Sequence, residues 1–131
     1  MLAKGTENIV NAMKKRGVKR IIMESSYPMS GSPEGMEFLK QVGMSDQQIA
    51  TVQPAIDDKI EQENVVKKSG LDWIIVRPLS LTDGIKTGSY RVGEKMDIKQ
   101  TDNISRADVA DFLLRAIKDD KWLHKIVVVT Y

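Results

Sequence analysis

The sequence predicts an α/β domain in which a mainly parallel sheet is flanked by helices. Three continuous apolar runs, at residues 21–23, 73–76 and 126–129, are rich in β-branched residues and too short for helices. Such runs are typical of parallel strands that are covered on both faces. A segment with helical spacing precedes each run, and this alternation favours parallel pairing.

The composition of the chain excludes several classes of protein. The 131 residues suit a single domain, 1–131, with one core. Twenty basic residues against eighteen acidic ones give a net charge of +2, which is too balanced to imply a nucleic-acid or membrane partner. The chain has no cysteine, which excludes disulfides and thiolate chemistry and favours a cytoplasmic location. No apolar run approaches the roughly 20 residues of a membrane helix, and no signal-peptide core is visible.

The first predicted unit is a helix followed by a strand. Thr6 can cap a helix that runs to about Arg16, and Gly17 can end it. A strand at 18–23 follows after a one-residue gap. A Gly/Pro/Ser-rich loop at 28–35 comes next, before a short helix at 36–42. Because it is a long excursion after a strand, we expect the loop to serve as a lid or binding loop.

The second predicted unit contains the central strand of the chain. Ser45 and Gln48 can form a capping box, and Pro54 is expected to restart the helix at its first position, so that the helix reaches Ser69. The strand at 73–76 follows Gly70. Pairing should stop at Pro78, because proline cannot donate a ladder hydrogen bond. The polar loop at 79–84 then lies at the carboxyl end of a parallel strand, where ligands bind in α/β sheets.

The last predicted unit begins with two short strand candidates, at 89–92 and 96–99. Ser105 can cap the next helix, with Asp108 three residues later, close to a capping box. The apolar face of this helix runs to Ile117. A final strand is expected at Lys125–Thr130.

Two stretches carry a family resemblance. SGLDWIIVRPLSLTDG at 69–84 and ISRADVADFLLRAI at 104–117 resemble segments of the atypical short-chain dehydrogenases/reductases. The resemblance is closer to the NAD(P)H-binding group that includes NmrA-like regulators, biliverdin reductase B and flavin reductases. It extends over nearly the whole chain, and it implies the carboxyl-terminal half of a Rossmann fold.

The amino-terminal features of that family have no counterpart here. The family begins with a strand, a GxxGxxG phosphate loop and two βα units, and none of these is recognisable in the sequence. The resemblance therefore implies a partial Rossmann fold that lacks the amino-terminal phosphate-loop βαβ units. A truncated product, a fragment and a natural short form are all consistent with it.

The resemblance implies catalytic roles for Ser26 and Lys59. In the family a serine at this strand end lies by the nicotinamide, and Ser26 matches it best, with Ser25 beside it as a cofactor-binding residue. The alternative is a strand-end serine that bonds its own backbone. Lys59 stands in the place of the lysine of the YxxxK pair, which contacts the nicotinamide ribose, whereas the tyrosine position is Ala55. The alternative for Lys59 is a solvated residue paired with nearby carboxylates on its helix.

The resemblance also implies cofactor contacts along one loop. In the family this loop, here Arg77, Pro78, Leu79, Ser80 and Leu81, runs along the nicotinamide. Ser80 stands where biliverdin reductase B has a histidine, which argues against a tetrapyrrole substrate. The alternative is a segment that only ends a strand and turns the chain. An apolar set could form a wall for a flat ring or could equally be core: Tyr27, Met29, Met36 and Phe38.

These features lead to three functional hypotheses. The first is an NAD(P)H-dependent oxidoreductase-like chain of the flavin or biliverdin reductase type, with NADP or NAD as cofactor and a flat aromatic substrate such as a flavin. The second is a non-catalytic NmrA-like dinucleotide sensor or interaction module. The third is an inactive truncated remnant. A metal site is not expected, because His124 is the single histidine and no carboxylates converge on it.

The partial fold also predicts an assembly. In the complete fold the strand at 18–23 would have a neighbour on each side, and one of those neighbours is not in this sequence. A strand left as a sheet edge exposes unpaired amides and carbonyls. We therefore expect a homodimer joined through the edge of strand 18–23 or the faces beside it. Without the phosphate loop, we expect only weak NAD(P)H binding by the chain alone.

Overall fold

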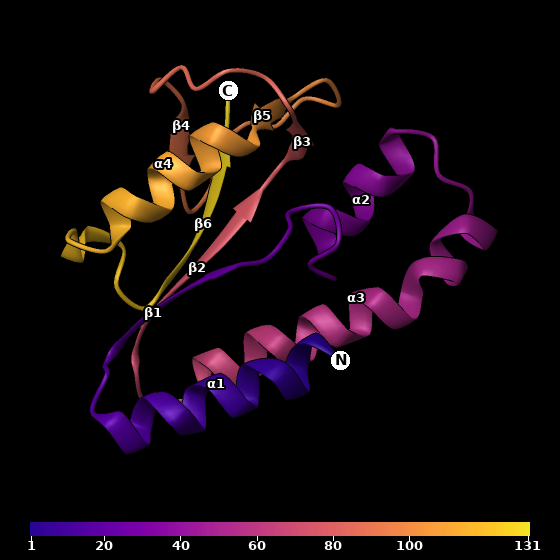
Figure 1. The fold of residues 1–131 in the computed structure, drawn as a ribbon. Helices are drawn as coiled ribbons and strands as arrows, with labels where there is room; N and C mark the ends of the chain where they lie inside the picture. Colours follow the sequence, from indigo (N-terminus) through magenta and orange to yellow (C-terminus); the bar gives the residue numbers. More distant parts are fainter.

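The computed structural model describes residues 1–131, and its helices lie on both faces of a central sheet (Figure 1). In chain order the elements are α1 (Leu2–Arg16), β1 (Arg20–Glu24), α2 (Pro33–Gln41), α3 (Asp46–Lys67), β2 (Asp72–Pro78), β3 (Ser80–Thr82), β4 (Arg91–Gly93), β5 (Asn103–Ser105), α4 (Arg106–Ala116), η1 (Asp120–Trp122) and β6 (Lys125–Thr130). Helix α4 covers one face of the sheet, and α1 and α3 form the layer on the other face.

The main sheet has four strands in the order β1-β2-β6-β4. Strands β1, β2 and β6 are parallel, and β4 runs antiparallel to β6 at the far edge. The register pairs Ile22 with Ile74, and Val76 with Val127. A separate two-stranded parallel ribbon joins β3 to β5. The predicted α/β class with a mainly parallel sheet is confirmed.

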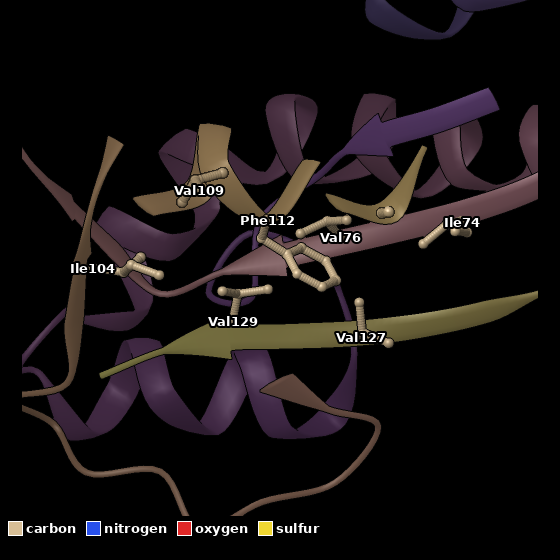
Figure 2. Packing of buried hydrophobic residues seen from close by; sticks show 8 residues of the cluster. Ile74, Val76, Ile104, Val109, Phe112, Val127 and Val129 are labelled. Atoms are coloured by element: carbon tan, nitrogen blue, oxygen red, sulfur yellow. The ribbon is translucent and has the colours of Figure 1, made fainter. Parts of the chain in front are cut away.

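The main core lies between α4 and the sheet. Because side chains alternate along a strand, Ile74 and Val76 of β2 share one face with Val127 and Val129 of β6. The Phe112 ring of α4 enters this face among the valines (Figure 2). Phe112 is nearly fully buried, so α4 is fixed on the sheet mainly by apolar burial.

The opposite face is covered by α3, which meets the sheet through Val66, Met23 and Ile75. Helix α1 packs on α3 rather than on the sheet, and its buried Thr6 hydroxyl accepts from the Gln62 amide at 3.1 Å. Thr6 therefore lies inside α1 and does not cap it. The amino end of α1 is instead satisfied by Asp58, whose carboxylate accepts from the Leu2 and Ala3 amides. The Asp58 pKa is lowered mainly by these two backbone hydrogen bonds.

Other expected boundaries differ from the structure. Helix α3 is continuous from Asp46, capped by the predicted Ser45–Gln48 box, and Pro54 lies inside it. Pro54 is exposed and forfeits one intrahelical bond, a loss that the long packed helix tolerates. Residues 80–82 form strand β3 instead of a loop, because β5 supplies a partner 23 residues later in sequence. Residues 96–99 are not a strand.

Candidate functional site

The candidate site lies at the carboxyl edge of the parallel strands. Chain segments leaving β1 and β2 stay side by side there, because the Ser25 amide donates to the Val76 carbonyl at 2.6 Å and the Tyr27 amide donates to the Pro78 carbonyl at 3.0 Å. These bonds bring residues 25–26 beside residues 77–78, whereas residues 80–82 pair with β5. This is the edge at which open α/β sheets bind ligands.

A buried polar cluster sits directly beneath this edge. Glu63 of α3 is 2% exposed, and it accepts from the Ser25 hydroxyl at 2.7 Å. Its two carboxylate oxygens also accept from the Arg77 guanidinium, at 2.9 and 2.6 Å. The side chains of Ser25 and Arg77 are therefore engaged inside the protein. Through Glu63 they tie β1 and β2 to α3, which fixes the backbone of the site.

Ser26 has a different environment from Ser25. Its side chain is half-buried, and its hydroxyl oxygen accepts from the Met29 amide at 3.2 Å. That bond matches the local backbone bonding considered as the alternative role. It leaves the hydroxyl proton without an acceptor, so Ser26 can still donate to a ligand.

The segment after Arg77 offers few free groups. Pro78 and Leu79 are buried, and the Leu79 amide donates to the Val129 carbonyl at 3.2 Å. Leu79 packs with Phe38 and Val128, so it belongs to the core. Ser80 and Leu81 are exposed in β3, where they pair with β5. Of this segment, the Ser80 hydroxyl and the Leu81 side chain are the groups open to a ligand.

Lys59 lies on α3 one turn before Glu63. Its side chain is half-buried and forms no ion pair, because Glu63 turns to Arg77 and Asp57 accepts from Gln53 instead. The surface pairing considered for Lys59 is therefore not formed. Ala55, at the tyrosine position of the YxxxK pair, is exposed one turn earlier.

A cavity of about 350 Å³ opens beside the edge, on the α3 face of β2 and β6. Its wall includes Tyr27, Arg77, Met96 and Val128. Burial and the Glu34 carboxylate raise the Tyr27 pKa, against the opposing effect of Arg77. The phenol therefore stays protonated and can donate a hydrogen bond into the cavity.

The other members of the expected apolar wall are core residues. Phe38 meets Tyr27 edge-on at a centroid distance of 5.8 Å. Met29 and Met36 pack against the cluster of Leu39, Ile49 and Ile56. Only Tyr27 of that set lines the cavity.

Asp108 is the centre of a second polar cluster, which the sequence analysis did not predict. Its fully buried carboxylate accepts from the Tyr131 hydroxyl at 2.6 Å, the Thr87 hydroxyl at 2.7 Å and the Gly88 amide at 2.8 Å. Burial raises its pKa, but these hydrogen bonds outweigh that effect and hold the pKa well below its ordinary value. The expected cap from Ser105 is present, since the Asp108 amide donates to the Ser105 hydroxyl.

Three further features lie outside the candidate site. No group of three or more histidine, cysteine or carboxylate residues is placed to hold a metal ion. His124 is exposed, at a positive φ of 60°, and its ring meets Trp73 edge-on. None of the helices combines the length and the apolar character needed to cross a membrane.

Comparison with known proteins identifies the family. The model of the NAD(P)H-binding family matches residues 2–120, so the chain belongs to this family. A relative from Arabidopsis thaliana, an uncharacterized chloroplastic protein, is 30% identical over 129 residues, covering 94% of this chain and 42% of its own length. NAD(P)H is accordingly the cofactor class of the family.

Solved structures give the same fold. A candidate NAD-dependent epimerase/dehydratase from Bacillus halodurans is similar at TM-score 0.75 and 26% identity, over 96% of this chain and 52% of that protein. The anaerobillin reductase ChuY from Escherichia coli O157:H7 is similar at TM-score 0.74 and 22% identity, over 95% and 55%. A short-chain dehydrogenase/reductase from Veillonella parvula in complex with NADP is similar at TM-score 0.71 and 19% identity, over 98% and 58%.

The chain spans about half the length of these relatives. The predicted membership and partial Rossmann fold are confirmed by the family and by these structures. The chain offers hydroxyl donors at the carboxyl edge but no phosphate loop. The Ser26 and Ser80 hydroxyls are free to donate to a ligand, whereas none of the nine glycines forms the GxxGxxG spacing that cradles a pyrophosphate.

Proposed function

We propose that this chain forms the nicotinamide and substrate side of an NAD(P)H-dependent oxidoreductase of the flavin or biliverdin reductase type. The observation that carries the proposal is that the segment from Ser25 to Tyr27 runs beside the end of β2 at the carboxyl edge of the sheet, next to a cavity of about 350 Å³ whose wall includes Tyr27 and Arg77. Cavities of this size are typical of small-molecule sites.

Each residue then has a defined role. The bound cofactor supplies the hydride. The Ser26 hydroxyl, whose proton has no acceptor in the protein, would donate a hydrogen bond to the nicotinamide carboxamide, and Ser80 is exposed after the end of β2. Lys59, which has no carboxylate partner, contacts the ribose hydroxyls. Ser25 and Arg77 act through Glu63 as positioning residues and do not contact the cofactor.

The cavity is the proposed place of the second substrate. Its apolar wall at Met96 and Val128 suits the face of a flat ring such as a flavin. The protonated Tyr27 supplies a hydrogen-bond donor in the wall of the cavity. No tyrosine acid stands at Ala55, so the proton balance of the reaction is left to the flavin and solvent.

A second candidate function follows from the same position. Because Ala55 replaces the tyrosine of the YxxxK pair, a non-catalytic NmrA-like dinucleotide sensor or interaction module also fits the site. The two candidates differ in turnover, not in binding.

Fluorescence titration of the purified chain with NADPH tests the proposal. We expect weak binding, with a Kd of roughly 1 mM, because the pyrophosphate has no glycine-loop amides to bind. Reduced nicotinamide mononucleotide should compete, since it carries the half that the site fits. We also expect no appreciable oxidation of NADPH by the chain alone in the presence of a flavin. Low-micromolar affinity, or no competition by the mononucleotide, would contradict the proposal.

A further inference from the structure

The amino edge of the parallel strands lies at the opposite end of the sheet from the candidate site. Helices α1 and α3 both end there, since Val18 follows α1 and leads into β1, and Leu71 follows α3 and leads into β2 (Figure 1, lower left). Helix α4 ends there too, because the Arg20 guanidinium at the start of β1 donates to the Ile117 carbonyl at 2.8 Å. Three helix ends therefore share one surface with the starts of the parallel strands.

This surface, formed by residues 14–20, 67–72 and 118–125 and called the basic edge, holds much of the positive charge of the chain. It contains ten of the twenty basic residues but only three of the eighteen acidic ones, which gives it a net charge of +7. The remainder of the chain then has a net charge of −5. The composition predicted no membrane or nucleic-acid partner because the total of +2 averages over these two regions.

Helix stabilisation accounts for only part of the charge on the basic edge. Cations are favourable at helix carboxyl ends, but each end carries a partial charge of roughly −0.5, so three ends offset only about 1.5 positive charges. Arg20 pairs with Asp120, and Lys125 pairs with Glu94. Six other cations are exposed and form neither an ion pair nor a side-chain hydrogen bond: Lys14, Lys15, Arg16, Lys19, Lys67 and Lys68. Their charge remains available to a partner.

The shape of the basic edge excludes a small anion as that partner. None of the six unpaired cations lines any of the three cavities of the protein. The basic edge is thus an open surface, which can meet an extended array of negative charges but does not enclose a single anion.

The apolar side chains on the basic edge distinguish between extended partners. Val18 is 50% exposed, and Ile117, beside Lys118, is 53% exposed. Aliphatic side chains among lysines suit a bilayer interface, where lysine stems also lie along apolar groups. Single-stranded nucleic acid would instead stack its bases on free aromatic rings. The aromatic rings here are engaged, since His124 meets Trp73 edge-on and the Lys121 ammonium lies 4.7 Å from the centre of the Trp122 ring.

We propose that the basic edge binds the surface of an anionic phospholipid bilayer, with the six unpaired cations over the lipid headgroups. Clusters of about four to eight lysines and arginines attract such surfaces. The candidate site lies at the carboxyl edge of the sheet, so a bound chain keeps that site open to solution. The proposal does not depend on the reductase assignment, because it needs no cofactor.

Co-sedimentation of the chain with vesicles tests the proposal. One set of vesicles contains equimolar phosphatidylserine and phosphatidylcholine, and the other contains phosphatidylcholine alone. At about 0.15 M salt we expect binding to the anionic vesicles only, and at about 1 M salt we expect that binding to be lost, because the screening length falls to about 3 Å. Absence of binding to the anionic vesicles would overturn the proposal, and so would equal binding to both sets.

Charge removal locates the binding surface. A cation near an anionic surface contributes a factor of about five in affinity, so the double variant Lys67→Gln, Lys68→Gln should weaken vesicle binding roughly 25-fold. Lys14→Gln, Lys15→Gln is a second test pair and should have a similar effect. All four lysines are exposed, so we expect both variants to fold, which circular dichroism checks.

The matched control is Lys40→Gln, Lys99→Gln, which removes the same charge from two exposed lysines outside the basic edge. We expect the control to bind anionic vesicles as the wild type does. Equal weakening by the control and the test pairs would mean that total charge rather than the basic edge drives binding, and this would contradict the proposal. Binding of a random-sequence DNA duplex at the same salt, without binding of the vesicles, would assign the basic edge to nucleic acid instead.

Discussion

Removing the carboxylate of Glu63 is the sharpest perturbation of the candidate site. In Glu63→Gln the side chain keeps its size but loses its charge. Arg77, whose side chain is 16% exposed, then loses its bidentate partner, because an amide NH2 group replaces one carboxylate oxygen. The remaining amide oxygen can accept from the Ser25 hydroxyl or from Arg77, as Oε1 of Glu63 does.

The magnitude follows from the burial of the pair. Breaking a buried ion pair by removing one partner costs about 3–5 kcal/mol. Because Arg77 retains some solvent access, we expect the lower end, about 3 kcal/mol. For a chain of this size that loss lowers the thermal midpoint by roughly 10 °C.

The assay is urea denaturation followed by circular dichroism. Glu61→Gln is the matched control, because it makes the same chemical change at an exposed position on the same helix. The double variant Glu63→Gln, Arg77→Met should recover much of the loss, since it leaves no uncompensated charge. A Glu63→Gln protein within 0.5 kcal/mol of the wild type would refute the structural role assigned to the cluster.

Three further predictions concern the core, the second polar cluster and the cofactor contacts. Phe112→Ala should lower the unfolding free energy by about 3–5 kcal/mol in urea denaturation, because the ring fills the space among the valines (Figure 2); a loss below 1 kcal/mol would contradict that packing. The lowered pKa of Asp108 means that its stabilisation is complete above about pH 4 and is lost as the pH falls below that value. Asp108→Asn should therefore be less stable at pH 7 and show a flatter decline in the acid range; an unchanged acid profile would count against the cluster. Ser26→Ala and Lys59→Ala should each weaken binding of reduced nicotinamide mononucleotide about 2- to 10-fold in a fluorescence titration, and unchanged affinity would remove the reason for naming that residue.

The sequence predicts those elements whose signals lie within a few neighbouring residues. The strand containing Ile74 to Val76 and the final strand were predicted because a run of β-branched residues needs no distant partner to be recognised. The box of Ser45 and Gln48 was predicted for the same reason, since both bonds lie within one turn.

Features set by distant partners could not be predicted in this way. Thr6 suits a helix cap, but its partner Gln62 lies 56 residues away. Strand β3 forms because β5 pairs with it. Glu63 is one of the carboxylates near Lys59 on its helix, yet it is buried against Ser25 and Arg77, residues that only the folded sheet brings together.

The sequence indicated where the candidate site lies, but it did not indicate which hydrogen bonds its side chains form. The resemblance assigned residues 25–26 and 77–81 to one site, and the structure brings residues 25–26 beside residues 77–78 at the sheet edge. It did not distinguish Ser26, which keeps a free donor, from Ser25, which is bound to Glu63. That difference arises from the alternation of side chains at the strand end.

The most direct test of the central claim is chemical-shift mapping of the isotope-labelled chain with the two halves of the cofactor. Reduced nicotinamide mononucleotide should shift the amides of Ser26, Ser80 and Leu81. Adenosine diphosphate should leave those amides unchanged, because this chain offers no pyrophosphate loop. Equal shifts with both halves, or mononucleotide shifts confined to residues away from the carboxyl edge, would contradict the assignment of this chain to the nicotinamide side.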